Sequence, residues 1–330
     1  MKISRMTALV AVAALAATAA GCSTQSSGGS NSANSLSQLS IIAPANPGSG
    51  WDGTARALQE ALQDTGLAKR VEVTNVPGAS GTVALAQFGA SEGKSGTWMA
   101  SGLAMMSGVI TNKTDTTLDD VTPLARLTGE SELIVVPADS PYQSIDDLAE
   151  AVKADPGSVA IAGGSAGSAD HIFLGLWAQA YGIEPSKLNF VPFSGGGEAT
   201  TALLGNKVAA GVAGTSEFAA QVQAGKLRPL LVSSTEKIES LPDAPTVTDI
   251  DKSELDFYNW RSVLAPKGIS DADRTTYLAV LDELVKSDKW KETLTTNDWQ
   301  DLYLSGDDFS TWQTSESERV RGVLEDLSLA

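Results

Sequence analysis

A glycine-rich stretch near the start of the chain has the spacing of a dinucleotide-binding loop. Residues 44–53 read Pro-Ala-Asn-Pro-Gly-Ser-Gly-Trp-Asp-Gly and place G-x-G-x-x-G between a predicted strand and a predicted helix. Two prolines lengthen this loop before its first glycine, whereas a dinucleotide-binding loop turns sharply off its strand. The second strand ends near Asn75, where an acidic residue for the ribose hydroxyls is expected, and Glu72 lies in mid-strand. The context argues against a nicotinamide or flavin cofactor, and we expect no cofactor.

A second motif has the form of a hydrolase turn. Residues 163–167, Gly-Gly-Ser-Ala-Gly, match the G-x-S-x-G turn that presents a nucleophilic serine. The general base would be a histidine on a separate loop, but the single histidine, His171, follows Ser165 by only six residues. We predict that His171 is a packed or cleft-lining side chain, or that it donates a hydrogen bond to a ligand. An exported serine hydrolase using Ser165 is the enzymatic alternative.

Loops of the same glycine and serine chemistry recur after predicted strands. Most of them end at the start of a predicted helix, where backbone N–H groups and the helix dipole attract anions. The carboxyl ends of parallel strands share one edge of a sheet, so these loops should meet there. They therefore predict a site for a carboxylate or phosphate that needs few cationic side chains. Besides residues 48–52, the loops are residues 77–81, 101–102, 163–168, 194–197 and 214–216.

The elements that position these loops alternate between strand and helix. This pattern predicts an α/β protein with mostly parallel sheets and a C-terminal segment of helices alone. Ser144 and Asp147 have the spacing of a capping box for the predicted helix 145–154. The predicted strands are 39–43, 71–76, 97–101, 158–162, 188–193, 207–213 and 227–233, with an extended segment over 124–127 and 132–136. The predicted helices are one beginning at Thr54, then 82–88, 145–154, 169–181, 198–204, 217–224, 272–287, 290–295 and 309–327.

The N-terminal segment has the features of an export signal. Residues 1–21 contain Lys2 and Arg5, then an alanine-rich apolar run, then small residues directly before Cys22. These small residues resemble the lipobox of bacterial lipoproteins, which implies cleavage before Cys22 and a lipid such as palmitate on the processed chain. An ordinary signal peptide with an incidental cysteine is the alternative. Residues 22–37 are almost entirely small and polar, and they predict a flexible tether.

Composition restricts the possible partners. Forty acidic residues against 23 basic residues give a net charge of −17, and removing Lys2 and Arg5 with the signal leaves −19. Such an acidic surface does not suit nucleic acid, and it must bind an anion through local dipoles. Cys22 is the only cysteine, so the mature chain has neither a disulfide nor a thiolate metal site, and we expect no metal. After the signal, no stretch is apolar and long enough to span a membrane.

Seven segments, taken in order, resemble the solute-binding proteins of tripartite tricarboxylate transporters, the TctC or Bug family. They are residues 43–52, 75–81, 164–171, 191–198, 224–228, 241–246 and 259–266. The resemblance implies a two-lobed, Venus-flytrap fold of the type II periplasmic binding class with additional C-terminal helices. The implied lobes are residues 38–135 with 258–330, and residues 136–257, with crossings near 132–137 and 257–266.

The same resemblance implies a function. The protein would be a monomeric, extracytoplasmic receptor, anchored to the membrane by its lipid. It would capture a di- or tricarboxylate, deliver it to a membrane permease and have no catalytic activity. A sensory lipoprotein that presents its ligand to a membrane kinase is the non-enzymatic alternative.

The resemblance also implies the residues that hold the ligand. Lobe 1 contributes Asn46, Gly48, Ser49, Gly50, Trp51, Ser80 and Gly81, and lobe 2 contributes Ser165, Gly167, Ser168, His171, Ser194, Gly195, Thr215 and Ser216.

Three residues in or beside this set have competing interpretations. We expect Asp52 to cap the first helix, because a carboxylate would repel an anionic ligand. Trp51 either lines the cleft or packs between the lobes. Arg261 either forms a bidentate contact with a ligand carboxylate or a salt bridge at the crossing.

Overall fold

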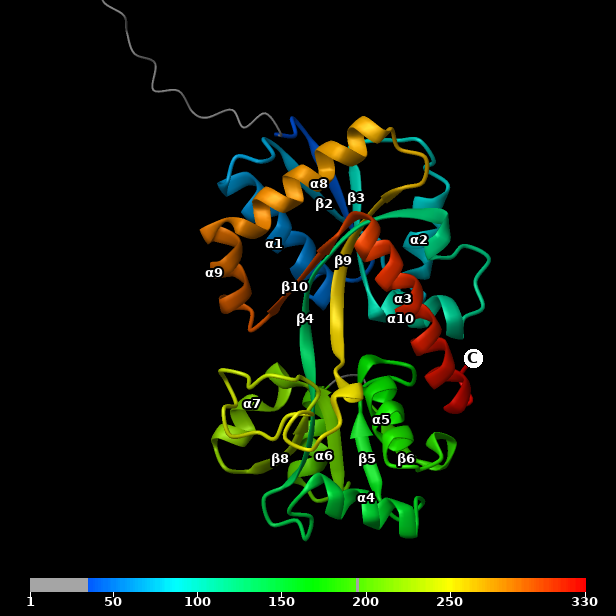
Figure 1. Cartoon of the computed structure of the whole chain (residues 1–330), viewed down its shortest axis with the longest axis vertical. Coiled ribbons are helices and arrows are strands. Elements are labelled where there is room, and N and C mark those ends of the chain that lie inside the picture. Colours follow the sequence, from blue (N-terminus) through cyan, green and yellow to red (C-terminus); the bar gives the residue numbers. More distant parts are fainter. Residues whose placement is uncertain (1–34, 194–195) are drawn as a thin grey trace, which may run out of the picture. The chain divides into compact units, whose positions relative to one another are not determined.

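The computed structural model describes residues 35–193 and 196–330, which belong to one compact unit (Figure 1). The predicted signal peptide, the lipidation site Cys22 and most of the predicted tether lie outside the described residues. Ser194 and Gly195 also lie outside them.

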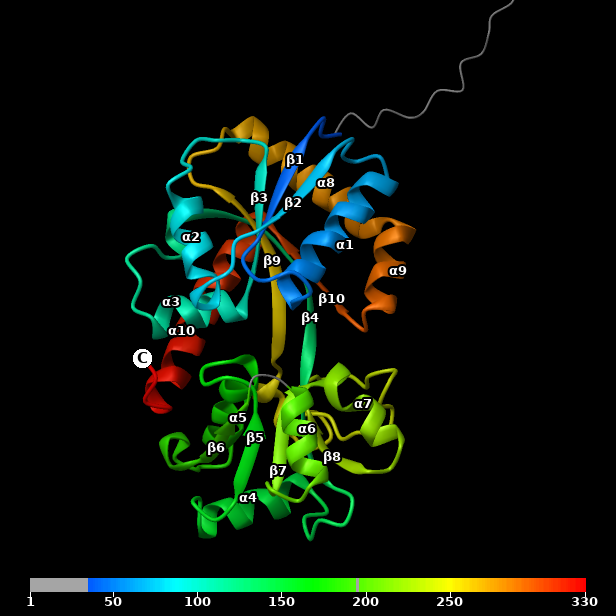
Figure 2. The same ribbon diagram turned by 180° about the vertical axis from the view of Figure 1, so that it is seen from behind.

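The first part of the sheet is built around β1 (Leu39–Ala43). This strand lies between β2 (Val71–Asn75) and β3 (Thr97–Gly102) and is parallel to both (Figure 2). On the far side of β3, the antiparallel strand β9 (Tyr258–Pro266) follows, and β4 (Val121–Pro137) pairs with β9. Strands β1 and β3 are short and mostly buried, which explains why their apolar runs predicted them well.

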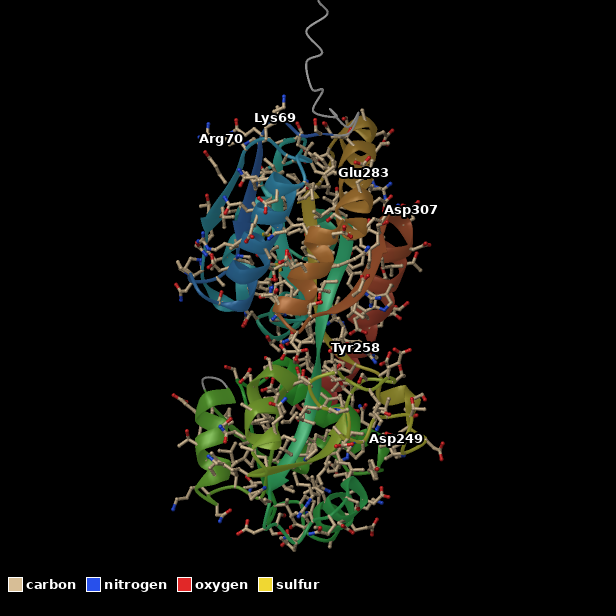
Figure 3. The ribbon with its side chains drawn as sticks, turned by 90° about the vertical axis from the view of Figure 1, so that its left-hand side faces the viewer. Lys69, Arg70, Asp249, Tyr258, Glu283 and Asp307 are labelled. Carbon is tan, nitrogen blue, oxygen red and sulfur yellow. The ribbon has the colours of Figure 1, made fainter. Side chains whose placement is uncertain are left out.

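The long strand β4 carries the sheet into its second part. Up to Ser131 it pairs with β9, and from Glu132 onward it pairs with β7 (Ala210–Gly214) and β8 (Leu227–Val232). The order then continues from β7 through β5 to β6. Their bounds are Ala160–Gly163 for β5 and Asn189–Pro192 for β6. We call the part on β1–β3 lobe 1 and the part on β5–β8 lobe 2. Tyr258 at the start of β9 lies where the two lobes meet, and Asp249 lies within lobe 2 (Figure 3).

The prediction of mostly parallel sheets is wrong. Among the strand pairs of the described residues, four are parallel and five are antiparallel. The antiparallel pairs all involve β4 or β9, the two strands by which the chain passes between lobes. A short apolar run shows that a strand is buried but does not show its direction.

The helices flank the two parts of the sheet. Ser144 caps α4 through the predicted box, in which the Asp147 N–H donates to Ser144 Oγ and the Ser144 N–H donates to the Asp147 carboxylate. The helices of lobe 1 are α1 (Gly50–Asp64), α2 (Thr82–Gly89), α3 (Leu103–Thr111), α8 (Asp271–Lys286), α9 (Asp288–Thr296) and α10 (Gly306–Asp326). Those of lobe 2 are α4 (Ile145–Ala154), α5 (Ala169–Ala180), α6 (Gly196–Leu204) and α7 (Thr215–Gln223). Short 3₁₀ turns cover Ala79–Gly81, Leu118–Asp120, Pro185–Lys187 and Ser253–Leu255.

Three local predictions differ from the structure. Helix α1 begins at Gly50 instead of Thr54, because Ser49 adopts the extended conformation of an N-cap residue. Helix α3 was not predicted, since it is buried on most sides and lacks an amphipathic pattern. The C-terminal segment is not made of helices alone, because β10 (Gln300–Ser305) lies between α9 and α10 and pairs with β4.

Helix α10 packs on elements of both lobes. Its side packs on β4 and α3 of lobe 1, and its C-terminal turns pack on α5 of lobe 2. Gly175 of α5 allows this approach, since a methyl group there would lie 2.8 Å from Val323 Cγ1. Gln179 Nε2 also donates to Asp326 Oδ2 at 2.7 Å. The C-terminal helix therefore stabilises the arrangement of the lobes.

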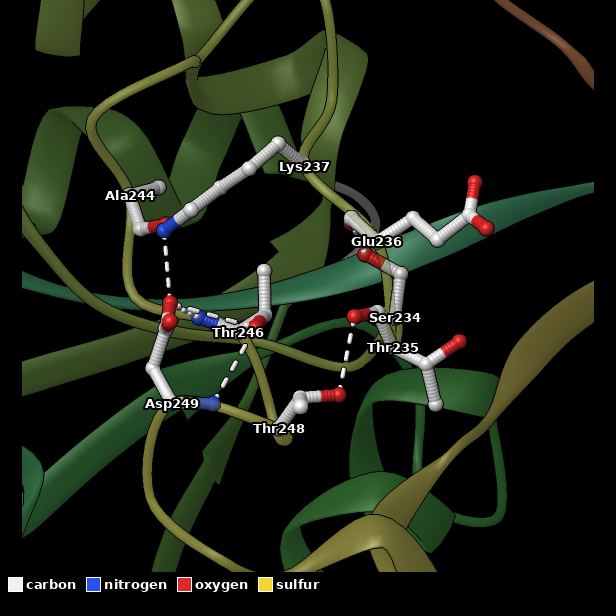
Figure 4. A network of polar contacts seen from close by, with 8 residues as sticks. All are labelled: Ser234, Thr235, Glu236, Lys237, Ala244, Thr246, Thr248 and Asp249. Carbon is white, nitrogen blue, oxygen red and sulfur yellow. Dashed lines mark hydrogen bonds and ion pairs between the residues drawn. The ribbon is translucent and has the colours of Figure 1, made fainter.

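A long connection between β8 and β9 is held by polar contacts (Figure 4). The carboxylate of Asp249 accepts from Lys237 Nζ at 2.5 Å and from the Thr246 N–H at 2.9 Å, and Lys237 Nζ also donates to the Ala244 carbonyl. These donors lower the pKa of Asp249 to about 2, with the Lys237 hydrogen bond as the largest cause. The segment is thus ordered by these polar contacts and by isolated bridge pairs at Thr246 and between Ile238 and Leu241, and it contains no extended strand.

Candidate ligand-binding site

The predicted glycine and serine loops do follow the carboxyl ends of strands. The loop after β1 leads into α1, the loop after β2 into α2, and β3 ends directly at α3. In lobe 2, the loop after β5 leads into α5, and β7 ends directly at α7. The loop after β6 includes Ser194 and Gly195, which lie outside the described residues.

The loop after β1 is closed by an internal carboxylate. Asp52, which is only 3% exposed, accepts from the Gly48 N–H at 2.8 Å, from Asn75 Nδ2 at 2.8 Å and from Arg56 Nε at 2.9 Å. The Arg56 hydrogen bond is the largest cause that lowers the pKa of Asp52 to about 2. The expectation that Asp52 is the N-cap is wrong, because Ser49 holds that position and Asp52 lies in the first turn. Asp52 is a structural residue, and the Gly48 N–H is already used.

The other residues of this loop differ in exposure. Asn46, Gly48 and Gly50 are exposed, and Ser49 is half-buried with an Oγ that has no partner among the described residues. A methyl group on Gly50 would lie 2.9 Å from Arg261 Nη2, so this glycine lets the guanidinium approach the start of α1. The exposed N-terminus of α1 and Arg261 therefore lie together.

Trp51 packs within lobe 1. It is 8% exposed, and its six-membered ring lies 3.1 Å from the position that a Cβ atom on Gly81 would take. Gly81 has a φ of +84° and also lies against Met105, so a side chain at this position is disfavoured twice. The structure therefore brings Trp51 and Gly81 together, while the neighbouring Ser80 is exposed.

The loop after β5 holds its own side chains in the same way. The Gly164 N–H donates to Asp170 Oδ2 at 2.6 Å, and the Gly167 N–H donates to His171 Nδ1 at 3.2 Å. From lobe 1, Ser107 Oγ donates to the Gly167 carbonyl at 2.6 Å. Ser165 is exposed and Ser168 is half-buried. This loop is therefore where lobe 1 contacts lobe 2 by a buried hydrogen bond.

His171 is packed as an aromatic side chain. Its ring stacks on Phe190 with 3.9 Å between centroids and an angle of 7°. Burial lowers the pKa of His171 to about 4, so the ring is neutral at physiological pH. Its Nδ1 accepts a backbone N–H, which fixes the ring away from the role of general base for Ser165.

The N-terminus of α7 is also occupied by an internal carboxylate. The Ser216 N–H donates to Glu130 Oε1 at 2.8 Å, and Glu130 lies on the part of β4 that pairs in lobe 1. Thr215 is buried, whereas Ser216 is exposed. The donors that were predicted to receive a ligand carboxylate at Ser216 thus hold a side chain of the protein in this structure.

Arg261 lies where these loops converge. Its Nη1 donates to Asn259 Oδ1 at 2.5 Å, and no carboxylate among the described residues lies within ion-pair distance of it. Burial lowers the pKa of Arg261, and the nearby charges of Glu130 and Glu132 oppose this shift. The guanidinium is thus available to a ligand at the start of α1.

Sequence reasoning missed the acidic residues at this point. Glu132 is completely buried, and neither of its carboxylate oxygens has a hydrogen-bond partner among the described residues. Burial raises the pKa of Glu132 well above its ordinary value, and the nearby carboxylates of Asp170, Glu130 and Glu217 raise it further. Arg261 opposes this shift. An acid directly before the apolar run Leu-Ile-Val-Val was the available signal, since a charged side chain seldom occupies a buried strand.

Two classes of feature are absent from the part of the chain that is described. Its histidine, cysteine, aspartate and glutamate side chains do not gather in groups of three or more that could hold a metal ion. Its helices also lack the combination of length and apolar character needed to cross a membrane.

A family model and a relative of known sequence both match this chain. Residues 54–329 match the model of the TctC family, described as the tripartite tricarboxylate transporter family receptor. The protein BugT of Bordetella pertussis is 30% identical over 236 residues, which cover 69% of this chain and 70% of BugT.

Solved structures share the fold. A TctC solute-binding protein from Polaromonas, without ligand, superposes with a TM-score of 0.75 at 24% identity, covering 88% of this chain and 98% of that one. The malate-bound MatC of Rhodopseudomonas palustris superposes with a TM-score of 0.63 at 19% identity, covering 89% and 99%. An adipate-bound protein of R. palustris gives 0.70 at 20% identity, covering 88% and 97%. These structures confirm the two-lobed fold of the periplasmic binding class. The chain belongs to the TctC family, the extracytoplasmic receptors of tripartite tricarboxylate transporters.

Proposed function

We propose that this receptor captures a small organic carboxylate and delivers it to the membrane permease of a tripartite tricarboxylate transporter. The observation that carries the proposal is the meeting of Arg261 with the exposed start of α1 at Gly50. A guanidinium beside free helix N–H groups binds a carboxylate through charge and directed hydrogen bonds. The malate and adipate in the two R. palustris structures support a di- or tricarboxylate as the ligand.

The ligand-binding residues remain those proposed from the sequence. In lobe 1 they are Asn46, Gly48, Ser49, Gly50, Trp51, Ser80, Gly81 and Arg261, and in lobe 2 they are Ser165, Gly167, Ser168, His171, Ser194, Gly195, Thr215 and Ser216. Exposure of Asn46, Gly50 and Ser165 supports direct contact, whereas Trp51 and Gly81 would act by shaping the loop.

The receptor would work by closing its lobes around the ligand. The change of sheet partners along β4 between Ser131 and Glu132 supports a hinge near the proposed boundaries, with lobe 1 as residues 38–135 and 258–330 and lobe 2 as residues 136–257. A closed surface of this kind can present the bound state to a permease.

The protein would be a monomer without catalytic activity, and a lipid on Cys22 would attach it to the membrane outside the cytoplasm. The engagement of His171 Nδ1 by the Gly167 N–H supports a binding role over serine hydrolysis. Replacing Cys22 by Ser should release the protein from the membrane fraction, and retention of the variant there would contradict the anchor.

The ligand class can be tested by thermal unfolding with a panel of carboxylates. A ligand that binds only the folded state raises the unfolding midpoint in proportion to its affinity and concentration. We expect at least one di- or tricarboxylate to raise the midpoint of the wild type and to lose this effect in Arg261→Met. Lys69→Met, on an exposed lysine remote from the loops, is the matched control. A panel in which no carboxylate shifts the midpoint would contradict the proposal.

A further inference from the structure

The unpaired acid at the junction of the lobes is unusual in this protein. Glu132 is 0% exposed, and both of its oxygens lack a hydrogen-bond partner among the described residues. Burying an ionised carboxylate without a partner is costly, and a folded protein normally satisfies such a group. A bound molecule that donates hydrogen bonds to Glu132 would offset this cost.

Three further carboxylates lie within electrostatic range of Glu132 and come from separate elements. Glu130 lies two residues earlier on β4 and therefore on the same face of the strand. Asp170 and Glu217 lie in the first turns of α5 and α7, whose N-termini follow the loops of lobe 2. The charge of Arg261 acts on Glu132 in the opposite sense to these acids. The surroundings of Glu132 are thus negative.

The backbone donors on this side are already used by the chain. Asp170 accepts from the Gly164 N–H at 2.6 Å, and Glu130 accepts from the Ser216 N–H at 2.8 Å. A ligand carboxylate would have to displace these side chains and would then meet Glu132. On the opposite side, Arg261 and the start of α1 favour an anion. The site is therefore asymmetric in charge.

We propose that the ligand of this receptor is an amino-carboxylate, whose carboxylate is bound near Arg261 and Gly50 and whose protonated amine is bound by Glu132. This inference rests on the proposed function and specifies the substrate class of the same site. An ammonium group supplies the donors that both oxygens of Glu132 lack, and it offsets the negative charge of Glu130 and Asp170. Glu132 is the first residue of β4 that pairs in lobe 2, so separation of the lobes at this point would give the amine access.

Matched pairs of ligands that differ only by an amine test the proposal. Calorimetric titration of the wild type should compare aspartate with succinate and glutamate with glutarate. We expect the amine-bearing member of at least one pair to bind about ten-fold tighter or more, as charged hydrogen bonds of this kind require. Glu132→Gln keeps the size of the side chain and removes its charge, so it should abolish the difference within the pair. Glu318→Gln, on an exposed acid of α10, is the matched control and should keep the difference.

The outcomes separate this inference from the proposed function. Equal or tighter binding of succinate or glutarate would overturn the amine assignment and leave a carboxylate receptor intact. Failure of all four compounds together with the wider carboxylate panel would contradict the proposed function itself. A thermal shift caused by Ca²⁺ or Mg²⁺ alone, and lost in Glu132→Gln, would also overturn the assignment, because the acids would then serve a metal. The unfolding midpoint of ligand-free Glu132→Gln shows whether the variant is folded.

Discussion

Two buried carboxylates have opposite environments. One is Asp52 at the start of α1, and the other is Glu132, which lies where β4 passes between the lobes. Asp52 receives hydrogen bonds from a backbone N–H, an amide and a guanidinium, and its pKa falls to about 2. Glu132 receives none among the described residues, and burial raises its pKa well above the ordinary value. The first acid stabilises a loop, whereas the second costs stability and is available to a ligand. Burial of a charge therefore does not identify its role until its donors are counted.

The largest effect on stability is expected from Asp52→Ala. The change leaves the Gly48 N–H and the Asn75 amide without their acceptor and removes the partner of Arg56, which should lower the free energy of unfolding by about 3 kcal/mol. Urea denaturation at pH 7 measures this loss. Arg56→Ala is the matched control and should cost less than about 1 kcal/mol, because that side chain is half-exposed. Similar losses in the two variants would contradict the role assigned to the buried acid.

A gain in stability, instead of a loss, is expected for Glu132→Gln in the absence of ligand. Replacing an acid that is buried without partners by a neutral amide removes the cost of desolvating the charge, so the free energy of unfolding at pH 7 should rise by about 1–2 kcal/mol. The same denaturation experiment measures the gain. A loss of stability instead would mean that Glu132 has a structural partner and that the contrast with Asp52 is false.

The two acids should also respond to pH in opposite directions. The stabilisation from Asp52 is present above its ordinary pKa of 3.8 and is lost as the pH falls towards about 2, because the unfolded chain takes up the proton first. Glu132 favours the folded state below its ordinary pKa of 4.5, and this contribution is lost as the pH rises through its elevated folded pKa.

Thermal midpoints between pH 2 and pH 8 measure both effects. The difference between wild type and Asp52→Asn should narrow below pH 3.8, and the advantage of Glu132→Gln should grow as the pH rises above 4.5. If the midpoint of a variant and that of the wild type depend on pH in the same way, the pKa shift assigned to the replaced acid is wrong.

The smallest effect is expected from Ser107→Ala. It removes the buried hydrogen bond from lobe 1 to the Gly167 carbonyl and should cost about 1 kcal/mol. Part of this cost should appear as easier separation of the lobes, which hydrogen exchange of the loop after β5 would detect. Thr275→Ala, an exposed residue that loses only a bond to the Asp271 carbonyl within α8, is the control. Unchanged exchange in Ser107→Ala would show that this bond does not hold the lobes together.

Much of the fold follows from local patterns. The short apolar or β-branched runs of β1–β3, the capping box of α4 and the glycine loops each depend on a few neighbouring residues, and the structure confirms them. Strand direction could not be predicted in the same way, because β4 and β9 are antiparallel to partners far away in the chain. Helix α3 and strand β10 were missed because burial on most sides, or a half-buried edge position, leaves no clear periodicity.

The amino-acid sequence alone determined where the loops of the site are and that they are rich in glycine, serine and backbone donors. It also determined the family, because seven motifs in order are specific even when each is weak. Only the tertiary structure decided which donors remain free. Glu130 and Ser216 are remote in sequence, yet the Glu130 carboxylate accepts the Ser216 N–H at the start of α7. Arg261 of β9 likewise lies beside Gly50 at the start of α1. A local pattern cannot contain such pairings, because hydrogen bonds and charge compensation depend on distance in space and not along the chain.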